Sequence, residues 1–429
     1  MPASGKHSIF MKQLLSWWLV LILAACAARA QSAGFLRAKD ARIVDGQGRE
    51  IILRGMGLGG WMVQEGYMLG VNGEGTQHLI KSRITDLVGK EDCAKFYQLW
   101  LENDMNRPDV DLLAKAGFNS IRLPMHYNLF TRPIEEEPVK GQNTWLTTGF
   151  TLTDNLLAWC KANRMYLILD LHASPGGQGK DANISDADPA KPSLWESTAN
   201  RQKTIALWRR LAERYASEPW IGGYDLLNEP NWTFEGKDKN GRDDASNKPI
   251  WDLYQAITKT IREVDSNHMI IIEGNGWGNN YNGFPGPWDK NMVMSFHKYW
   301  NPNTQEAIAR FIGLRERYRL PLWLGESGEN NNQWFRECVA LVEKNQIGWA
   351  WWPYKKVNSG SCILTITRPD NFKQVVDFWS GKGARPAREI AASGLLELAK
   401  NAQAANCRFN ADVVHALIPS GSATPAPAR

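Results

Sequence analysis

The sequence predicts a single (β/α)8 TIM barrel with long loops after its strands. The prediction starts from two short apolar runs that each end in a glutamate, residues 224–230 (YDLLNEP) and 322–326 (LWLGE). Their glutamates, Glu229 and Glu326, are 97 positions apart. A barrel of this type uses roughly 31 residues for each strand and helix, so about three such units separate them. Glu229 is therefore expected after the fourth strand and Glu326 after the seventh, both at the mouth of the barrel.

The other elements follow in a regular order. A hairpin around residues 45–46 leads into a first strand that ends near Gly55, and further strands are expected at 118–123, 165–171, 221–227, 269–273, 292–296, 322–324 and 347–351. Helical patterns occupy residues 92–103, 108–116, 153–163, 201–216, 250–264, 304–317, 332–345 and 387–399. Short apolar strands that alternate with helices favour one parallel barrel over two domains. An open doubly wound sheet is the main rival, but no glycine-rich phosphate turn follows the first strand.

Composition agrees with a large globular protein. The chain has 429 residues, of which 43% are hydrophobic and 22% are charged, so it can bury a sizeable core. The net charge of +5 comes from scattered basic residues rather than a basic helix, so nucleic acid is not an expected partner. The 20 tryptophans exceed the need of a core, because each buried indole N–H requires a partner. We expect many of these rings to line a surface groove.

The first 30 residues have the features of a signal peptide. Lys12 precedes an apolar run at 14–25 that is too short to span a bilayer, and residues 28–30 (ARA) form a small-x-small cleavage site. We therefore expect a secreted or periplasmic protein. The alternative is a lipoprotein signal that ends before Cys26, which would anchor the protein to the cell envelope by lipidation. A membrane partner is expected only in that case.

The mature chain is expected to hold one catalytic domain at residues 31–410 and a low-complexity, mobile tail at 411–429. Cleavage after residue 30 would leave five cysteines, none of them in a C-x-x-C pair, so a zinc site is not expected. An oxidising compartment permits one or two disulfides, and the odd count leaves at least one thiol unpaired.

Polar side chains stand at the ends of the expected strands, which is where (β/α)8 enzymes build their active sites. They are Arg122, His172, Asn228, Glu229, Glu273, His297, Tyr299 and Glu326, followed by the pair Trp351 and Trp352. Cleavage of a glycosidic bond requires two carboxylates on one wall, because one protonates the leaving oxygen while the other attacks or activates water. The two glutamates with aromatic residues around them meet that requirement.

This ordered set resembles glycoside hydrolase family 5, the cellulase family of retaining (β/α)8 enzymes. The resemblance spans roughly residues 43–400 and includes IRLP after strand two, His after strand three, NEP after strand four, HxY after strand six, GE after strand seven and Trp after strand eight. It implies that Glu229 is the acid/base and that Glu326 is the nucleophile of a double displacement.

The resemblance also implies the supporting roles. Asn228 would bind the sugar 2-hydroxyl, and Arg122 and Tyr299 would keep Glu326 ionised. His172 and His297 would orient the acid/base and bind hydroxyls. A tryptophan after strand eight would stack on the sugar, with Trp351 and Trp352 both eligible, and Trp61 in the glycine-rich segment 56–61 is a further stacking candidate.

Several acidic and basic side chains have a competing structural interpretation. Glu329 is the only nearby rival of Glu326 as nucleophile, and Glu326 is favoured because it follows its strand directly. We interpret Glu273, Asp170 and Asp225 as structural support. His126 either lines the cleft or packs in the interior.

We expect a β-linked oligo- or polysaccharide as substrate, hydrolysed by a monomeric enzyme without metal or organic cofactor. An endo-β-1,4-glucanase is the first expectation, and an exo-β-1,3-glucanase, a mannanase or a glycolipid glycosidase are alternatives. Long loops at 64–90, 172–200, 231–249 and 353–383 would suit a groove, or would close one end into an exo-acting pocket. A non-catalytic carbohydrate-binding barrel is the alternative from another class, but a binder has no need for the glutamate pair.

Overall fold

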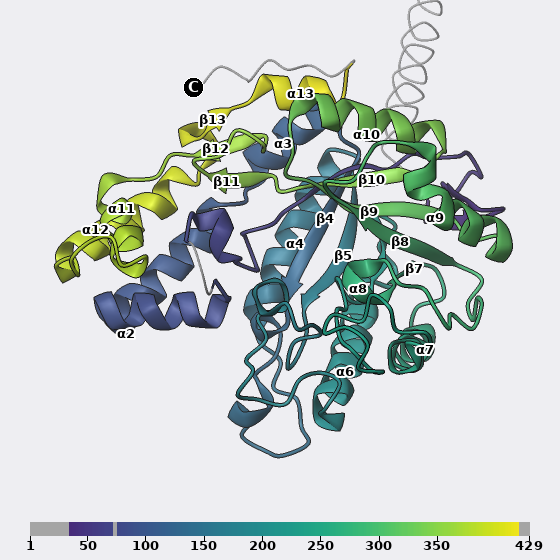
Figure 1. The fold of residues 1–429 in the computed structure, drawn as a ribbon, viewed down its shortest axis with the longest axis horizontal. Coiled ribbons are helices and arrows are strands. Elements are labelled where there is room, and N and C mark those ends of the chain that lie inside the picture. The colour runs from purple at the N-terminus through teal and green to yellow at the C-terminus, as the bar shows by residue number, and fades with distance from the viewer. Residues whose placement is uncertain (1–33, 72–74, 420–429) are drawn as a thin grey trace, which may run out of the picture.

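The computed structural model describes residues 34–71 and 75–419. Its centre is a closed barrel of parallel strands in the order β10-β3-β4-β5-β6-β7-β8-β9, which confirms the predicted (β/α)8 barrel (Figure 1). The strands are β3 (Arg54–Gly57), β4 (Ser120–His126), β5 (Tyr166–Ala173), β6 (Ile221–Asp225), β7 (Met269–Glu273), β8 (Met292–Lys298), β9 (Leu322–Gly328) and β10 (Gly348–Trp352). The expected signal peptide at 1–30, including Cys26, lies outside the described residues.

Helices connect the strands and cover the outside of the barrel. They are α3 (Arg107–Ala116), α4 (Thr147–Ala162), α6 (Thr198–Tyr215), α7 (Lys248–Arg262), α9 (Gln305–Tyr318) and α10 (Asn332–Lys344), with the short α5 (Ala182–Ser185) and α8 (Asn275–Gly278) at the mouth. Local sequence sets their ends. Helix α3, for example, starts at Asn106, which forms a capping box with Asp109, and stops at Gly117, whose φ of 101° is left-handed.

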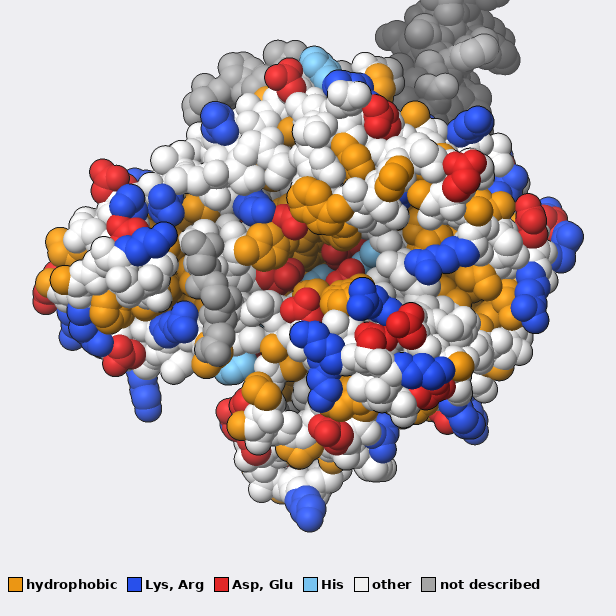
Figure 2. Space-filling model, viewed as in Figure 1, with side chains coloured by type: hydrophobic (Ala, Val, Ile, Leu, Met, Phe, Trp, Pro, Cys, Tyr) orange, Lys and Arg blue, Asp and Glu red, His pale blue; other side chains and the backbone are white. Residues whose placement is uncertain are grey.

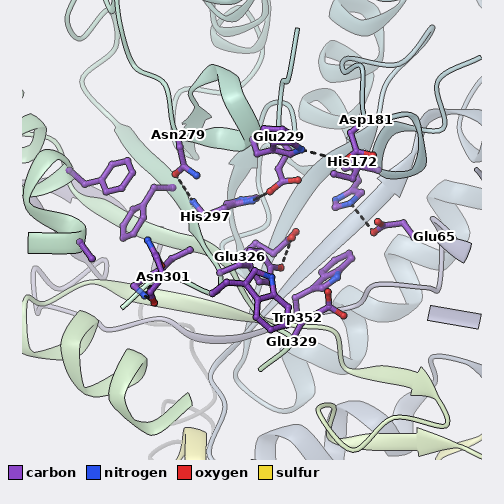
Figure 3. A pocket seen from close by; sticks show the side chains of 18 of the residues that line it. Glu65, His172, Asp181, Glu229, Asn279, His297, Asn301, Glu326, Glu329 and Trp352 are labelled. Atoms are coloured by element: carbon purple, nitrogen blue, oxygen red, sulfur yellow. Dashed lines mark hydrogen bonds and ion pairs between the residues drawn. The ribbon is translucent and has the colours of Figure 1, made fainter. Parts of the chain in front are cut away.

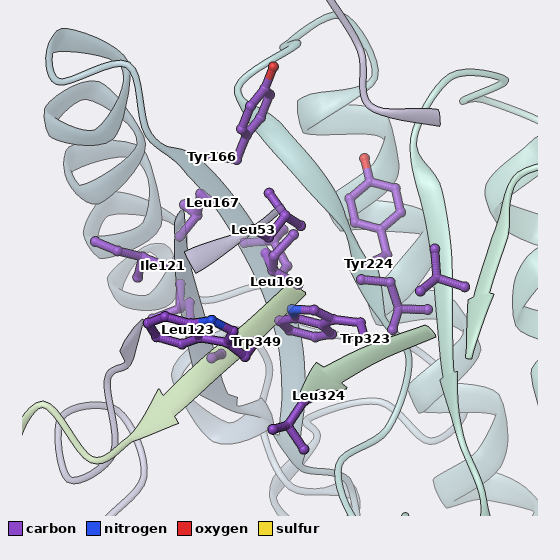
Figure 4. Close-up of a cluster of buried hydrophobic side chains, with 14 of the residues drawn as sticks. Leu53, Ile121, Leu123, Tyr166, Leu167, Leu169, Tyr224, Trp323, Leu324 and Trp349 are labelled. Atoms are coloured by element: carbon purple, nitrogen blue, oxygen red, sulfur yellow. The ribbon is translucent and has the colours of Figure 1, made fainter. Parts of the chain in front are cut away.

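Alternation along each strand separates two environments. In β4 and β5 the side chains of Leu123, Leu167 and Leu169 belong to the apolar layer between strands and helices, which also contains Trp349 (Figure 4). Burial of each such leucine contributes about 1.5–3 kcal/mol to folding. The neighbouring positions point into the barrel and carry polar groups, because successive side chains of a strand face opposite ways. The interior is thus polar near the mouth.

Most of the tryptophans belong to the core rather than to a groove. Nine of those in the described residues are buried, and three line the cavity at the mouth of the barrel. The expectation that many rings line a surface groove is therefore wrong for the majority. The barrel is wide enough to pack these large rings between its strands and its helices.

A second group of elements packs beside the barrel, on the left of Figure 1. It contains α2 (Gln77–Asn103), α11 (Asp370–Trp379) and α12 (Arg388–Asn401), with the strands β11 (Lys355–Val357), β12 (Leu364–Ile366) and β13 (Arg408–Phe409). A two-stranded ribbon, β1 (Arg37–Lys39) and β2 (Arg42–Val44), precedes the barrel. Parts of the loops expected at 64–90 and 353–383 are therefore helical or extended. Gly89 kinks α2 with a φ of 84° and hides the length of the helix from periodicity.

The C-terminal tail begins later than expected. Helix α13 (Ala411–Leu417) packs against α10 and buries Val413, Val414 and Leu417, so the start of a mobile tail at residue 411 is wrong. Its short apolar stripe covers one face of a barrel helix, which explains why it is ordered. Residues 420–429 lie outside the described part of the chain.

The cysteines form no disulfide among the described residues. Cys93, Cys160, Cys338, Cys362 and Cys407 are all free thiols. Within residues 34–71 and 75–419, no helix combines the length and the apolar character needed to cross a membrane.

Candidate active site

A cavity of about 600 Å³ opens at the mouth of the barrel. Figure 2 shows acidic and histidine side chains in this hollow, with apolar side chains around it. Six of the predicted residues line the cavity: His172, Glu229, His297, Tyr299, Glu326 and Trp352. Figure 3 shows several of them from close by. Arg122 and Asn228 lie beneath the floor and are buried, while Trp61 and Trp351 lie elsewhere.

The two glutamates meet across the cavity. One carboxylate oxygen of Glu229, one of Glu326 and a ring nitrogen of His297 all lie within 4.8 Å of one another. Each glutamate is only 6% exposed. Glu326 lies within strand β9, just after a shift in the pairing register of that strand, whereas Glu229 follows β6 with a φ of 42°. This left-handed conformation is uncommon for a residue other than glycine.

Arg122 is the centre of a buried charge network. Its guanidinium donates hydrogen bonds to Glu326 at 2.8 Å, Asn228 at 2.8 Å and Glu273 at 3.0 Å. It also pairs with Asp225 at 2.9 Å and Asp170 at 3.2 Å. Burial raises the pKa of Asp225 well above its ordinary value, and Glu273 adds to this, while Arg122 acts in the opposite direction. The network fixes one cation directly beneath the two glutamates.

Glu326 is held by donors on both of its oxygens. Tyr299 donates its hydroxyl to Oε1 at 2.7 Å, and Arg122 occupies Oε2. Burial raises the pKa of Glu326, and the nearby Glu229 adds to this, while His297 and Arg122 act in the opposite direction. Donors and cations therefore stabilise the carboxylate form against a burial that favours the neutral form.

Two charged histidines flank the glutamates. The Nδ1 of His297 lies 2.7 Å from Oε1 of Glu229, and its Nε2 lies 3.1 Å from Glu273. Burial alone would lower the pKa of His297, but Glu273 and the other carboxylates raise it well above its ordinary value. His172 pairs with Asp170 at 2.8 Å, and this carboxylate outweighs burial and raises the pKa of His172 to about 10. His172 is therefore a cation at neutral pH, and the carboxylates around His297 favour its cationic form.

Neighbouring tryptophans on β10 point to opposite sides. Trp352 lines the cavity, stacks on His172 with a centroid distance of 5.1 Å, and donates its indole N–H to Tyr67 at 2.9 Å. Trp351 faces outward and packs against Phe335 of α10. Alternation along the strand thus selects Trp352 as the ring at the cavity.

The glycine-rich segment 56–61 passes beneath Trp352, as expected for a backbone that runs under the mouth. A Cβ atom on Gly57 or Gly59 would lie 2.8 or 2.5 Å from the ring of Trp352, so only glycine fits there. The prediction that Trp61 stacks on substrate is wrong. Trp61 is buried in the core, and its indole N–H donates to the carbonyl of Leu101 in α2 at 2.9 Å.

Sequence reasoning missed most of the cavity residues that loops supply. They are Glu65, Tyr67, Asp181, Asn183, Trp277, Asn279, Trp300 and Asn301. Glu65 is buried beside His172, with 3.9 Å between their side chains, and burial raises its pKa to about 7. Its position soon after the first strand is the only signal in the sequence that could have indicated it.

Ion pairs show where two side chains of uncertain role, Glu329 and His126, lie. Glu329 lies at the rim of the cavity and pairs with Lys356 at 2.7 Å, away from Arg122. His126 pairs with Asp186 at 2.9 Å and lines a second cavity of about 540 Å³.

Comparison with known proteins agrees with this geometry. A family model described as "Cellulase (glycosyl hydrolase family 5)" matches residues 83–358. A β-xylosidase from Phanerodontia chrysosporium is 28% identical over 360 residues, which are 75% of this chain and 71% of that protein. Endoglucanase C from Acetivibrio thermocellus is 25% identical over 315 residues, 58% of this chain and 84% of that protein.

Among solved structures, an endogalactoceramidase superposes with a TM-score of 0.55 and 20% identity, covering 85% of this chain and 84% of that one, which indicates a shared fold. The family match spans well over half of the chain and includes both glutamates and the strands that carry them. This chain therefore belongs to glycoside hydrolase family 5, and it is a glycosidase.

Proposed function

We propose that this chain is a retaining β-glycoside hydrolase in which Glu229 is the acid/base and Glu326 is the nucleophile. The distance between the two carboxylates carries the proposal. Retaining enzymes hold their two carboxyl groups about 5–5.5 Å apart, whereas inverting enzymes leave about 6.5–9.5 Å for a water molecule. Oxygens of Glu229 and Glu326 within 4.8 Å of each other support the retaining geometry.

The contacts of each glutamate support the assignment of roles. Glu326 has a donor on each oxygen and Arg122 beneath it, which suits a carboxylate that attacks. Glu229 has one side-chain partner, His297, and borders the cavity where a leaving oxygen would lie. A carboxyl that gains and loses a proton in each turnover needs such access.

The reaction then takes two steps. In the first, Glu326 attacks the anomeric carbon while protonated Glu229 gives its proton to the leaving oxygen, which forms a glycosyl ester on Glu326. In the second, Glu229 as carboxylate takes a proton from water, whose oxygen attacks the anomeric carbon and releases Glu326. The sugar keeps its β configuration because two inversions cancel.

Other cavity residues would hold the sugar. Trp352 lines the cavity with its apolar ring, and His172 and Glu65 beside it offer polar groups for hydroxyls. The hydrogen bond from Asn228 to the sugar 2-hydroxyl remains a prediction, since its amide is fully buried against Arg122 and lies 3.4 Å from His172.

For the substrate, we infer a short β-linked oligosaccharide or glycoside cleaved from one end. The segment 181–188 contributes different residues to the 600 Å³ cavity and to the 540 Å³ cavity, so this segment lies between the two cavities. Asn183 accepts the N–H of Gly75 at 2.9 Å, and Asp186 accepts the N–H of His78 at 2.9 Å. A fixed wall across the mouth favours a pocket over a continuous groove.

An endo-β-1,4-glucanase is the second candidate, supported by the similarity to Endoglucanase C. Digestion of a panel of β-1,4- and β-1,3-glucans, mannans, xylans and glycolipids separates the two. Mass spectrometry should detect only short products of one length from the first time point. Early products of many lengths would instead identify endo action, and NMR of the first anomer formed tests retention.

Export remains an expectation that rests on the first 30 residues. The mass of the mature N-terminus, measured on protein from the native host, would distinguish cleavage after residue 30 from lipidation at Cys26. A full-length intracellular protein would contradict both.

A further inference from the structure

Glu273 contacts both the acid/base Glu229 and its partner His297, but it does not line the cavity. It ends strand β7, is 0% exposed, and accepts the backbone N–H of Glu229 on Oε2 at 2.8 Å. Its Oε1 lies 3.1 Å from Nε2 of His297 and accepts a hydrogen bond from Arg122 at 3.0 Å. One buried carboxylate thus contacts the main chain of Glu229 and the histidine that bonds the side chain of Glu229.

The backbone contact matters because Glu229 is strained. Its φ of 42° is left-handed, a conformation that costs a residue with a Cβ atom about 1–2 kcal/mol. Two side chains hold it there: Glu273 accepts its N–H, and Asn231 donates to its carbonyl at 2.8 Å. A hydrogen bond to a charged acceptor is about twice as strong as a neutral one. Glu273 is therefore the stronger of these two restraints.

The histidine contact fixes a proton. The ring of His297 lies between the carboxylates of Glu229 and Glu273, one at each nitrogen, with Glu326 as the third carboxylate nearby. With both nitrogens protonated, the Nδ1–H of His297 points at Glu229, as the contact in Figure 3 indicates. Arg122 pairs with both Glu273 and Asp225, and within the described residues only Glu273 forms an ion pair with Nε2 of His297.

We propose that Glu273 is a positioning residue for acid–base catalysis: it holds Glu229 in its left-handed conformation and keeps His297 doubly protonated and aimed at the Glu229 carboxyl. The proposal rests on the proposed roles of Glu229 and Glu326. It assigns to Glu273 a part in turnover that a purely structural carboxylate would not have.

Glu273→Gln should therefore change how the rate depends on pH. Without its partner, His297 loses its second proton at lower pH, and a positive charge disappears beside Glu229 and Glu326. Glu326 then keeps its proton to higher pH, because the lost His297 cation acts on its pKa more strongly than the lost Glu273 carboxylate. The acidic limb of kcat/KM should therefore move up by about one pH unit. At the pH optimum of the unmodified enzyme we expect kcat/KM to fall by about 10- to 100-fold.

Two matched variants isolate this effect. Glu273→Asp keeps a carboxylate and should return the acidic limb towards its original position. Asp225→Asn removes a carboxyl that also pairs with Arg122 but contacts neither His297 nor the main chain of Glu229, so it should move the acidic limb less than E273Q does. A shift in D225N equal to that in E273Q, or a shift in E273D as large as in E273Q, would overturn the proposal.

NMR of ¹³C-labelled histidine gives a readout that does not need turnover. The His297 signal, identified by its loss in His297→Asn, should change from the charged to the neutral position at lower pH in E273Q than in the unmodified enzyme. Unchanged titration and unchanged limbs in a folded E273Q would refute the proposal. If E273Q does not fold, E273D decides by the same two measurements. Absence of glycosidase activity in the unmodified enzyme would sink the proposed roles instead, which is a separate result.

Discussion

The cavity has two kinds of wall, and they differ in rigidity. Strand ends supply His172, His297, Glu326 and Trp352, all of which are buried and held by partners within the barrel. Loops supply much of the remainder, including Trp300, which is 69% exposed and has a left-handed φ of 58°. Positions on strands can hold reacting groups to a fraction of an ångström, while loops tolerate variation. The strand wall thus suits the chemistry and the loop wall suits the choice of substrate.

Loss of the strand-borne nucleophile should have the largest effect. Glu326→Gln keeps the size of the side chain and its contact with Tyr299 but cannot form the glycosyl ester. We expect kcat/KM to drop by at least about 10⁴-fold on every β-glycoside. Kinetics on the substrate panel, with circular dichroism to confirm the fold, provides the test, and full residual activity would remove Glu326 from the mechanism.

Glu229→Gln should show a loss that depends on the leaving group. Without the acid, a sugar leaving group departs poorly, and we expect about a 10²- to 10⁴-fold loss. A dinitrophenolate needs no proton and should still form the intermediate rapidly. Comparison of the two substrates in one variant is the measurement. Equal losses on both would show that Glu229 does not act as the acid.

The same difference between strand ends and loops explains which site residues could be predicted from the sequence. Strand ends were predictable because a strand has a fixed direction and period, so Arg122 and Glu326 converge from 204 positions apart. The sequence alone could not show whether Trp351 or Trp352 faces the cavity. That choice depends on the register of β10 with β9 and β3. Trp61 was misplaced because its surroundings are set by α2, whose length was hidden by Gly89.

The loop wall was missed for a different reason. Glu65 and Tyr67 reach the cavity only because the chain between β3 and α2 folds back over the mouth. Tyr67 meets Trp352 across 285 positions, and no local pattern marks that contact. Loops have no period that would indicate which side chains face inward. The roles of the loop residues at the cavity are therefore inferred from the structure and not from the sequence.

Trp300→Ala should weaken binding of the leaving group without harming the chemistry. An aromatic ring at the rim can stack on a sugar or aryl group for about 0.5–1.5 kcal/mol, so we expect up to about a tenfold loss of kcat/KM on oligosaccharides. A glycosyl fluoride, whose leaving group is one atom, should react as before. Val139→Ala is the control, since Val139 is 50% exposed but does not line the cavity. Equal losses on fluoride and oligosaccharide would contradict a role of Trp300 in leaving-group binding.

Glu65 should give the smallest effect, visible in stability rather than rate. Burial raises the pKa of Glu65 from 4.5 to about 7, so the folded protein holds a proton that the unfolded chain has released. Stability falls with rising pH wherever the folded state binds more protons, so Glu65 lowers the melting temperature progressively between pH 4.5 and 7. Glu65→Gln should flatten this part of the curve of Tm against pH and be the more stable protein above pH 7, while Glu65→Asp should retain the slope. An unchanged slope in E65Q would mean that Glu65 is already ionised in the folded protein, and the loop wall would then present a fixed negative charge to the sugar instead of a carboxyl that can donate.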